Sequence, residues 1–149
     1  MKKENNITQS ITHTMMLVTN HCWKYVKKNS RNSDMSKVQF NVCSVVYHYP
    51  GISQDGISKT LQMDKSSIAK LIFKLIQMGM IERKVNPNDR REYQIYLTKA
   101  GKKAVKDTLS IVNEWETSVF GTMGENWKET IMEYLTQFEK AAREKEYDV

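Results

Sequence analysis

The chain has 149 residues, with 23 Lys or Arg against 17 Asp or Glu, and its formal net charge at pH 7 is +6. Few Gly (6) and Pro (2) favour long helices over a strand-rich fold, and no apolar run approaches the ~18 residues of a membrane span. The start, MKKENNITQS, lacks the apolar stretch that a secretory signal needs. Cys22 and Cys43 form no CxxC pair. We therefore expect one cytoplasmic domain over residues 1–149.

Two helices are predicted first. Apolar residues recur every three or four positions over residues 7–28, which indicates one helical stripe, and the polar segment 29–34 ends it. A second helix is expected over residues 36–49, where Pro50-Gly51 closes it. Its predicted inward face consists of Phe40, Cys43, Val46 and Tyr47.

A helix-turn-helix pattern follows. A short extended link over residues 52–53 ends in a serine that caps a third helix over residues 54–62. Asp64 is the predicted N-cap of a fourth helix, which ends at Met78 with Gly79 in the left-handed position after the helix. The predicted inward face of this fourth helix consists of Ile68, Leu71, Ile72, Leu75 and Met78.

Two strands with alternating polarity come next, over residues 81–85 and 93–98. The segment 86–92 between them is made of turn formers and arginines, which predicts a β-hairpin with a basic tip. The apolar phase of the two strands consists of Ile81, Val85, Tyr93, Ile95 and Leu97.

Two more helices complete the chain. Thr98 caps a fifth helix that runs to about Phe120, residues 121–124 break it, and a sixth helix covers about residues 125–145. We therefore predict a mostly α fold with a small β-wing. In it, a winged helix-turn-helix at about residues 36–103 is flanked by N- and C-terminal dimerisation helices at about residues 7–30 and 104–146.

The positive charge is concentrated in the winged segment. Residues 36–103 hold 12 Lys or Arg and 5 Asp or Glu, a net charge of +7. Residues 1–35 hold 6 Lys or Arg and 2 Asp or Glu, a net charge of +4. Residues 104–149 hold 5 Lys or Arg and 10 Asp or Glu, a net charge of −5. A positive field over one segment indicates that this segment binds a polyanion such as DNA.

The fourth helix has side chains suited to reading DNA. Short hydroxyls and lysines at Lys65, Ser66, Ser67 and Lys70 lie in its first two turns, where they can reach base edges and phosphates, and Lys74 extends this face. The alternative is an ordinary solvated face, because lysines on a helix usually have no further role.

The hairpin tip offers a second DNA contact. We expect Arg91 to enter a minor groove, Asp89 to orient it by accepting from its guanidinium, and Arg90 to lie on a phosphate. For an isolated hairpin the simpler interpretation would be a solvated Asp/Arg turn. Together with the preceding helix, the arginines predict a two-part DNA-binding unit.

These residues carry a family resemblance. Met78–Arg83 (MGMIER), Asp89–Arg91 (DRR) and Leu97–Gly101 (LTKAG) stand at the spacings of the patterns GLVxR, DxR and LTxxG. In these motifs the chain resembles the MarR family of bacterial transcription regulators, and the resemblance covers about residues 36–105.

The resemblance implies a homodimer of six-helix subunits that binds a pseudo-palindromic operator, usually as a repressor. A small phenolic or apolar ligand, an oxidant or a metal would relieve repression, and no cofactor is implied. A twofold dimer would place its two recognition helices about 34 Å apart, one turn of duplex. Apolar stripes with Trp23, Trp115 and Trp127 on the flanking helices support the dimer, although these residues could also pack within one chain.

Two other classes of function remain open at this point. An enzyme is disfavoured, because no nucleophile with a partnered base, phosphate-binding glycine loop or distinctive carboxylate pair is found. The other alternative is a winged-helix module that binds DNA architecturally or binds a protein, without a small-molecule effector. A defined inverted repeat as the preferred site would distinguish a regulator from both.

The sequence says less about an effector. Cys22, on the first helix beside aromatic residues, is a candidate redox sensor, but most lone cysteines are small buried hydrophobes. The three histidines at positions 13, 21 and 48 share no metal-ligand spacing, so no metal site is predicted. A pocket between the first helix and the winged segment is implied by the family resemblance alone, and its ligand residues are unknown.

Overall fold

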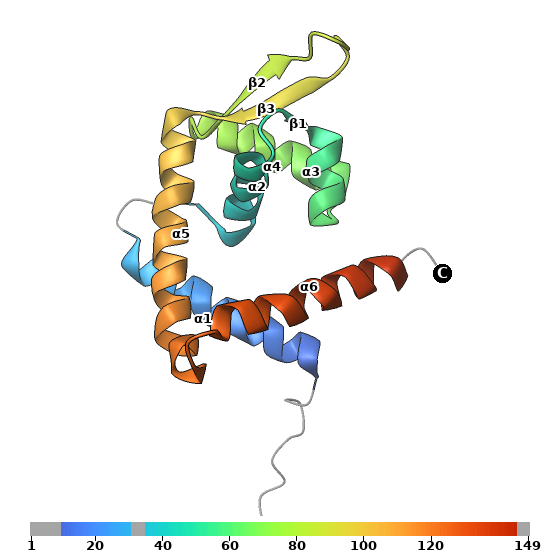
Figure 1. The fold of residues 1–149 in the computed structure, drawn as a ribbon. Coiled ribbons are helices and arrows are strands. Elements are labelled where there is room, and N and C mark those ends of the chain that lie inside the picture. Colours follow the sequence, from blue (N-terminus) through green and yellow to red (C-terminus); the bar gives the residue numbers. More distant parts are fainter. Residues whose placement is uncertain (1–9, 31–34, 146–149) are drawn as a thin grey trace, which may run out of the picture. The chain divides into compact units, whose positions relative to one another are not determined.

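The computed structural model describes residues 10–30 and 35–145, and Figure 1 shows a mostly helical chain with a small β-sheet. The elements are α1 (Ile11–Asn29), α2 (Lys37–His48), β1 (Ile52–Ser53), α3 (Gln54–Leu61), α4 (Lys65–Gln77), β2 (Ile81–Val85), β3 (Tyr93–Leu97), α5 (Lys99–Phe120), the short 3-10 helix η2 (Gly121–Met123) and α6 (Trp127–Lys145). The predicted mostly α fold with a small β-wing is confirmed.

The chain divides into two compact units. The first ends at Ile111 and the second begins at Val112, so helix α5 runs from one into the other. Each unit is described by itself below. A single domain over residues 1–149 therefore stays a prediction.

The sheet of the first unit has the strand order β1-β3-β2, and both pairs are antiparallel. Strands β2 and β3 form the predicted hairpin, with Ile81 opposite Leu97 at its base. Strand β1 adds Ile52 opposite Ile95, and the backbone N–H of Gly51 donates to the Ile95 carbonyl (2.9 Å). The two residues predicted to form an extended link thus form a third strand.

The hairpin is buried at its base alone. Ile81, Ile95 and Leu97 are buried, whereas Val85 and Tyr93, in the same apolar phase of the sequence, are exposed. In Figure 1 the tip of the hairpin projects beyond the helices, so the outer part of the hairpin buries fewer side chains than its base. Its exposed part is therefore available to a partner.

The helices of the winged segment begin at side-chain caps, of which those at Ser53 and Asp64 were predicted from the sequence. Ser36 and Gln39 form a reciprocal capping box, in which Gln39 is itself buried. Ser53 and Asp64 accept from the backbone N–H groups of the first turns of α3 and α4. Gly79 has φ +70°, the predicted left-handed conformation that lets β2 follow directly.

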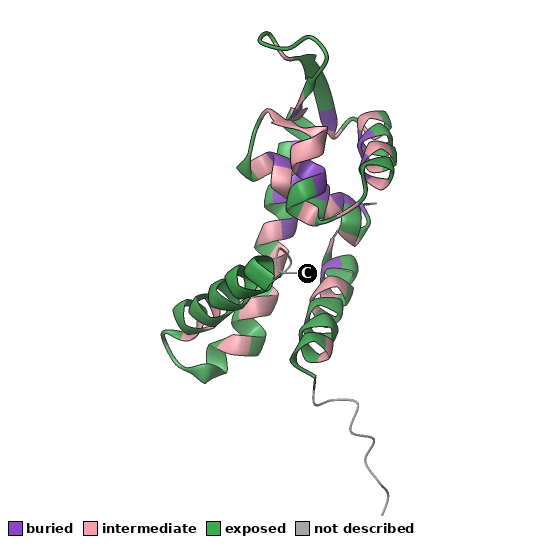
Figure 2. Cartoon of the chain, turned by 90° about the vertical axis from the view of Figure 1, so that its right-hand side faces the viewer, coloured by how far each residue is buried: buried purple, intermediate pink, exposed green. Residues whose placement is uncertain are grey.

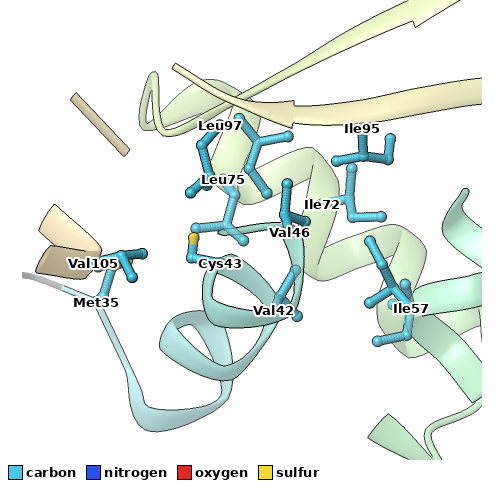
Figure 3. Close-up of a cluster of buried hydrophobic side chains, with 12 residues drawn as sticks. Met35, Val42, Cys43, Val46, Ile57, Ile72, Leu75, Ile95, Leu97 and Val105 are labelled. Atoms are coloured by element: carbon cyan, nitrogen blue, oxygen red, sulfur yellow. The ribbon is translucent and has the colours of Figure 1, made fainter. Parts of the chain in front are cut away.

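One hydrophobic core unites the helix-turn-helix with the sheet. Figure 3 shows its side chains converging from α2, α3, α4 and β3. The fully buried members include the predicted Cys43, Val46, Ile68, Ile72 and Leu75. Val42 and Val105 are also fully buried, so α2 turns a wider face inward than predicted and α5 contributes to the same core.

The start of α5 lies against the turn that follows α4. The Thr98 hydroxyl donates to the Gly79 carbonyl (2.6 Å) and accepts from the backbone N–H of Gly101 (3.0 Å), which confirms Thr98 as a cap. The backbone N–H of Thr98 donates to the Met80 carbonyl (3.0 Å). A Cβ at Gly101 would lie 2.1 Å from that carbonyl oxygen, so the approach requires glycine.

Helix α1 begins at Ile11 with Ser10 as its N-cap. The predicted start at residue 7, residues 31–34 of the predicted polar segment and the predicted end at residue 146 lie outside the described residues. Trp23 on α1 packs against Phe40 on α2, with ring centroids 5.7 Å apart. Most of the apolar face of α1 is exposed, at Ile11, Met15, Met16, Leu17 and Val18.

The second unit contains the end of α5, η2 and α6. Phe120 lies between Trp115 and Trp127, with both pairs of ring centroids 5.7 Å apart. Over Trp127–Lys145 no residue of α6 is buried, as the exposure colours of Figure 2 show. Exposed apolar residues of α6 are Met132, Tyr134, Leu135 and Phe138. Among the described helices of both units, none is long and apolar enough to span a membrane.

Candidate nucleic-acid interface

The outer face of α4 presents most of the predicted DNA-contacting residues to solvent. Lys65, Ser66, Lys70 and Lys74 are exposed, and Ser67 is half-buried. The opposite face packs into the core through Ile68, Ile72 and Leu75. Burial of one stripe fixes which side of the helix faces outward, because residues three or four apart share a face.

The two serines at the start of α4 have different roles. The carboxylate of Asp64 accepts from the backbone N–H of Ser67 (2.8 Å). The Ser67 hydroxyl also binds this carboxylate, and that hydrogen bond is the main cause that lowers the pKa of Asp64. Ser67 therefore helps to begin the helix, while Ser66 presents its exposed hydroxyl outward.

We expect Ser66→Ala to relax base preference, because it removes a hydroxyl that faces outward from the start of the helix. The expected loss for the preferred base is roughly 1–3 kcal/mol. Ser67→Ala should leave the preferred site unchanged and loosen the first turn of α4. Selection of bound duplexes from a random pool by each variant would measure this. Equal preferences for wild type and both variants would show that another face reads the bases.

Lys65 is held by an acidic residue at the start of α3. Its Nζ lies 2.6 Å from Oδ1 of Asp55, and Lys59 Nζ lies 3.0 Å from Oδ2 of the same carboxylate. The hydrogen bond from Lys65, followed by that from Lys59, lowers the pKa of Asp55. The ion pair joins the first turns of the two helices and sets the direction of the Lys65 side chain.

The tip of the wing is ordered by its own backbone. Asn86 N–H donates to the Glu92 carbonyl (3.0 Å), and Glu92 N–H donates to the Asp89 carbonyl (3.0 Å). The carboxylate of Asp89 accepts from the backbone N–H of Arg91 (2.9 Å). We expected this carboxylate to accept from the guanidinium of Arg91, but the structure places its contact on the main chain. Asp89 thus fixes the turn from which Arg91 projects.

Three cations line one hollow between the wing and the helix-turn-helix. Lys65, Arg83 and Arg91 surround a space of about 280 Å³, together with the acidic Asp55 and Glu92. The structure thus brings Arg91 of the tip and Lys65 of α4 to one place, although 25 positions separate them in the sequence. The exposed Arg90 belongs to the same tip, but does not line this hollow.

Arg83 was not among the residues predicted to bind DNA. It lies on β2 with its guanidinium carbon 5.8 Å from the centroid of the Tyr93 ring, in cation–π range. Arg83 shares the alternation phase of the apolar Ile81 and Val85, so periodicity alone gave no signal that it faces this hollow. Its position makes the cationic surface wider than α4 and the tip alone.

The described residues offer three features that bear on an effector: the two cysteines, the potential metal ligands and one further hollow. Cys22 is half-buried on α1, and burial raises the pKa of the Cys43 thiol to about 12, so Cys43 stays protonated. Over residues 10–30 and 35–145, no group of three or more His, Cys, Asp or Glu is placed to hold a metal. A hollow of about 560 Å³ lies between the end of α1 and the start of α5, lined by residues that include Asn29, Met80 and Ala104.

Comparison with known proteins is consistent with this geometry. The family model described as "MarR family" matches residues 35–93. The HTH-type transcriptional regulator BilQ of Clostridium symbiosum is 30% identical over 91 residues, which cover 61% of this chain and 63% of that protein. The matched segments span 40% to 63% of the length of three of the curated relatives.

Solved structures share the fold over most of the chain. A MarR transcriptional regulator from Methanosarcina mazei Go1 is 27% identical with a TM-score of 0.76, covering 89% of this chain and 96% of that one. A crystal structure of MarR has a TM-score of 0.82 at 19% identity, covering 97% of this chain and 98% of that one. The MepR–DNA complex of S. aureus has a TM-score of 0.73 at 22% identity, covering 89% and 98%. At such identities the likeness to MarR and MepR shows the fold.

Proposed function

We propose that this chain is a member of the MarR family and a sequence-specific, DNA-binding transcriptional regulator. The proposal is supported by the family model that matches its winged segment, by its regulator relatives and by the fold that it shares with MarR structures. In this proposal α4 enters the major groove and the wing lies beside it, with Arg91 in the adjacent minor groove. The relatives are regulators and not enzymes, and we propose no catalytic activity. A cytoplasmic location is part of the proposal, because the chromosome is there.

One observation carries the proposal. Lys65 at the start of α4, Arg83 on β2 and Arg91 at the wing tip line the same hollow, so both halves of the DNA-binding unit present cations toward one ligand. The exposed Lys70 and Lys74 continue this basic surface along α4. A duplex offers phosphates on both sides of a groove, which suits two cationic elements held beside each other.

We also propose that the regulator is a homodimer. Helices α1 and α6 each expose an apolar face, and these faces exceed the scattered apolar residues of an ordinary surface. The tryptophans give weaker support than expected, because Trp23 packs on Phe40 and Trp115 and Trp127 pack around Phe120. The exposed methionines, leucines and aromatic residues are therefore the better argument for a second subunit.

Repression of an inverted-repeat operator, relieved by a small apolar or phenolic ligand or by an oxidant, completes the proposal. The hollow between α1 and α5 is the place where such a ligand would fit, and oxidation would act at Cys22. The alternative remains a winged-helix module that binds DNA architecturally or binds a protein. That alternative predicts either equal affinity for all duplexes or no affinity for DNA.

Salt dependence and mass together test the proposed function. We expect a dimer in sedimentation at micromolar concentration that selects one inverted repeat from random duplexes. Its affinity should fall by roughly 10³–10⁵ between about 50 and 200 mM salt, because each phosphate contact releases condensed counterions. A monomer, or equal affinity for every sequence, would contradict the proposal. Binding of the selected repeat upstream of the regulator's own gene would connect it to transcription.

A further inference from the structure

The outer face of α4 contains a large apolar residue, Phe73, that is not buried in the core. Phe73 is 60% exposed, while its helix packs into the core through Ile68, Ile72 and Leu75. Phe73 belongs neither to the predicted inward face of this helix nor to its predicted DNA-contacting residues. Its exposure shows that it belongs to the surface that the proposed function turns toward DNA.

Phe73 stands in line with the residues proposed to read the major groove. Ser66, Lys70, Phe73 and Gln77 are all exposed, and their spacing of four, three and four places them on one stripe. At a rise of 1.5 Å per residue, Phe73 lies about 10 Å along the helix from Ser66. That distance corresponds to at most about three base pairs of duplex.

The surroundings of Phe73 favour a nucleic acid over an apolar protein partner. Lys70 and Lys74 are exposed on either side of it. An apolar protein surface would have to bury these two ammonium groups, whereas the phosphates beside a groove would pair with them. Within the major groove, the apolar feature that a phenyl ring can meet is the C5-methyl group of thymine.

From this arrangement we propose that Phe73 is a specificity-determining residue that contacts a thymine C5-methyl group in each half-site. The inference rests on the proposed function, because it needs α4 in the major groove. Lys70 and Lys74 hold the helix at the phosphates, and Phe73 reads the methyl group between them. The regulator would then prefer thymine at one position up to about three base pairs from the base that Ser66 reads.

Uracil provides a direct test, because it pairs like thymine but lacks the methyl group. The preferred duplex, selected first from a random pool, is titrated with each thymine of a half-site replaced in turn by deoxyuridine. Wild type should lose about fourfold in affinity at one position per half-site, as expected for one buried methyl group. Phe73→Ala should bind the thymine and uracil duplexes equally, while its melting temperature stays that of wild type.

Two control variants distinguish the loss of the methyl contact from a loss of phosphate contacts and from the loss of an exposed aromatic residue elsewhere. Lys74→Ala should weaken binding to the thymine and uracil duplexes by the same factor, because its contact is with phosphate. Tyr49→Ala removes an aromatic residue that is also 60% exposed but follows α2, and it should change neither affinity nor the uracil effect.

The remaining outcomes would contradict either the inference about Phe73 or the proposed function. If wild type is insensitive to uracil at every position, or if Phe73→Ala keeps the same sensitive position, Phe73 reads no methyl group and the inference fails. If no duplex is selected at all, the proposed function fails as well. Because the uracil substitution changes the DNA and not the protein, a folding defect in Phe73→Ala cannot mimic the wild-type result.

Discussion

Gly101→Ala is expected to lower the free energy of unfolding by about 3 kcal/mol, the largest stability effect that the structure predicts. The new Cβ would lie 2.1 Å from the carbonyl oxygen of Met80 and 3.2 Å from Cδ2 of Leu97. The carbonyl cannot turn away easily, because it accepts from the backbone N–H of Thr98. Alanine favours a helix by about 1 kcal/mol over glycine, which offsets only part of the strain.

Thermal and urea unfolding would measure the effect, and Gly121→Ala is the matched control. A Cβ at Gly121 would meet Cγ2 of Thr117 at 3.9 Å, an ordinary contact, so its stability should change by no more than about 1 kcal/mol. The strained variant would have to move α5 away from the turn after α4, and the wing with it. A Gly101→Ala protein as stable as wild type would show that this junction has room to relax.

Arg91→Ala is expected to lower operator affinity by about 10- to 100-fold, while the melting temperature stays nearly unchanged. Arg91 is exposed at the wing tip and lines the hollow shared with Lys65 and Arg83. An exposed arginine contributes little to folding, since surface ion pairs are worth only about 0–1 kcal/mol. Its guanidinium would instead bind in the minor groove, where a planar cation is favoured.

Two further variants test how the tip presents this arginine. Arg91→Lys should restore only part of the affinity, because a point charge cannot reproduce the planar fork. Asp89→Ala should cause a smaller loss than Arg91→Ala, because the guanidinium stays but the turn loses the hydrogen bond to the Arg91 N–H. Titration of the selected operator with all three variants at one salt concentration, beside thermal melts, gives the comparison.

A wing that does not read DNA would give a different result. If Arg91→Ala binds like wild type, the tip faces solvent in the complex. If the variant unfolds, Arg91 is structural, and its loss of binding says nothing about a groove. Arg90→Ala, on the neighbouring exposed residue, should cost less than Arg91→Ala, because we expect Arg90 to contact a phosphate and not a base.

The sequence by itself determined the elements of the winged segment. Ser36, Ser53, Asp64 and Thr98 each cap the helix that the local pattern predicted, and Gly79 has the predicted left-handed conformation. These features depend on neighbours within a few positions, where hydrogen-bonding chemistry and side-chain periodicity decide the conformation. The basic, exposed face of α4 also follows from periodicity alone.

Only the tertiary structure decided which distant residues meet. The pairing of β1 with β3, the contact of Gly101 with Met80 and the ion pair of Lys65 with Asp55 join segments that local patterns cannot relate. The exposure of Val85 and Tyr93 likewise depends on which part of the hairpin is covered by the core. The physical reason is that burial and charge pairing depend on the packing of whole elements, whereas caps and turns depend on adjacent residues.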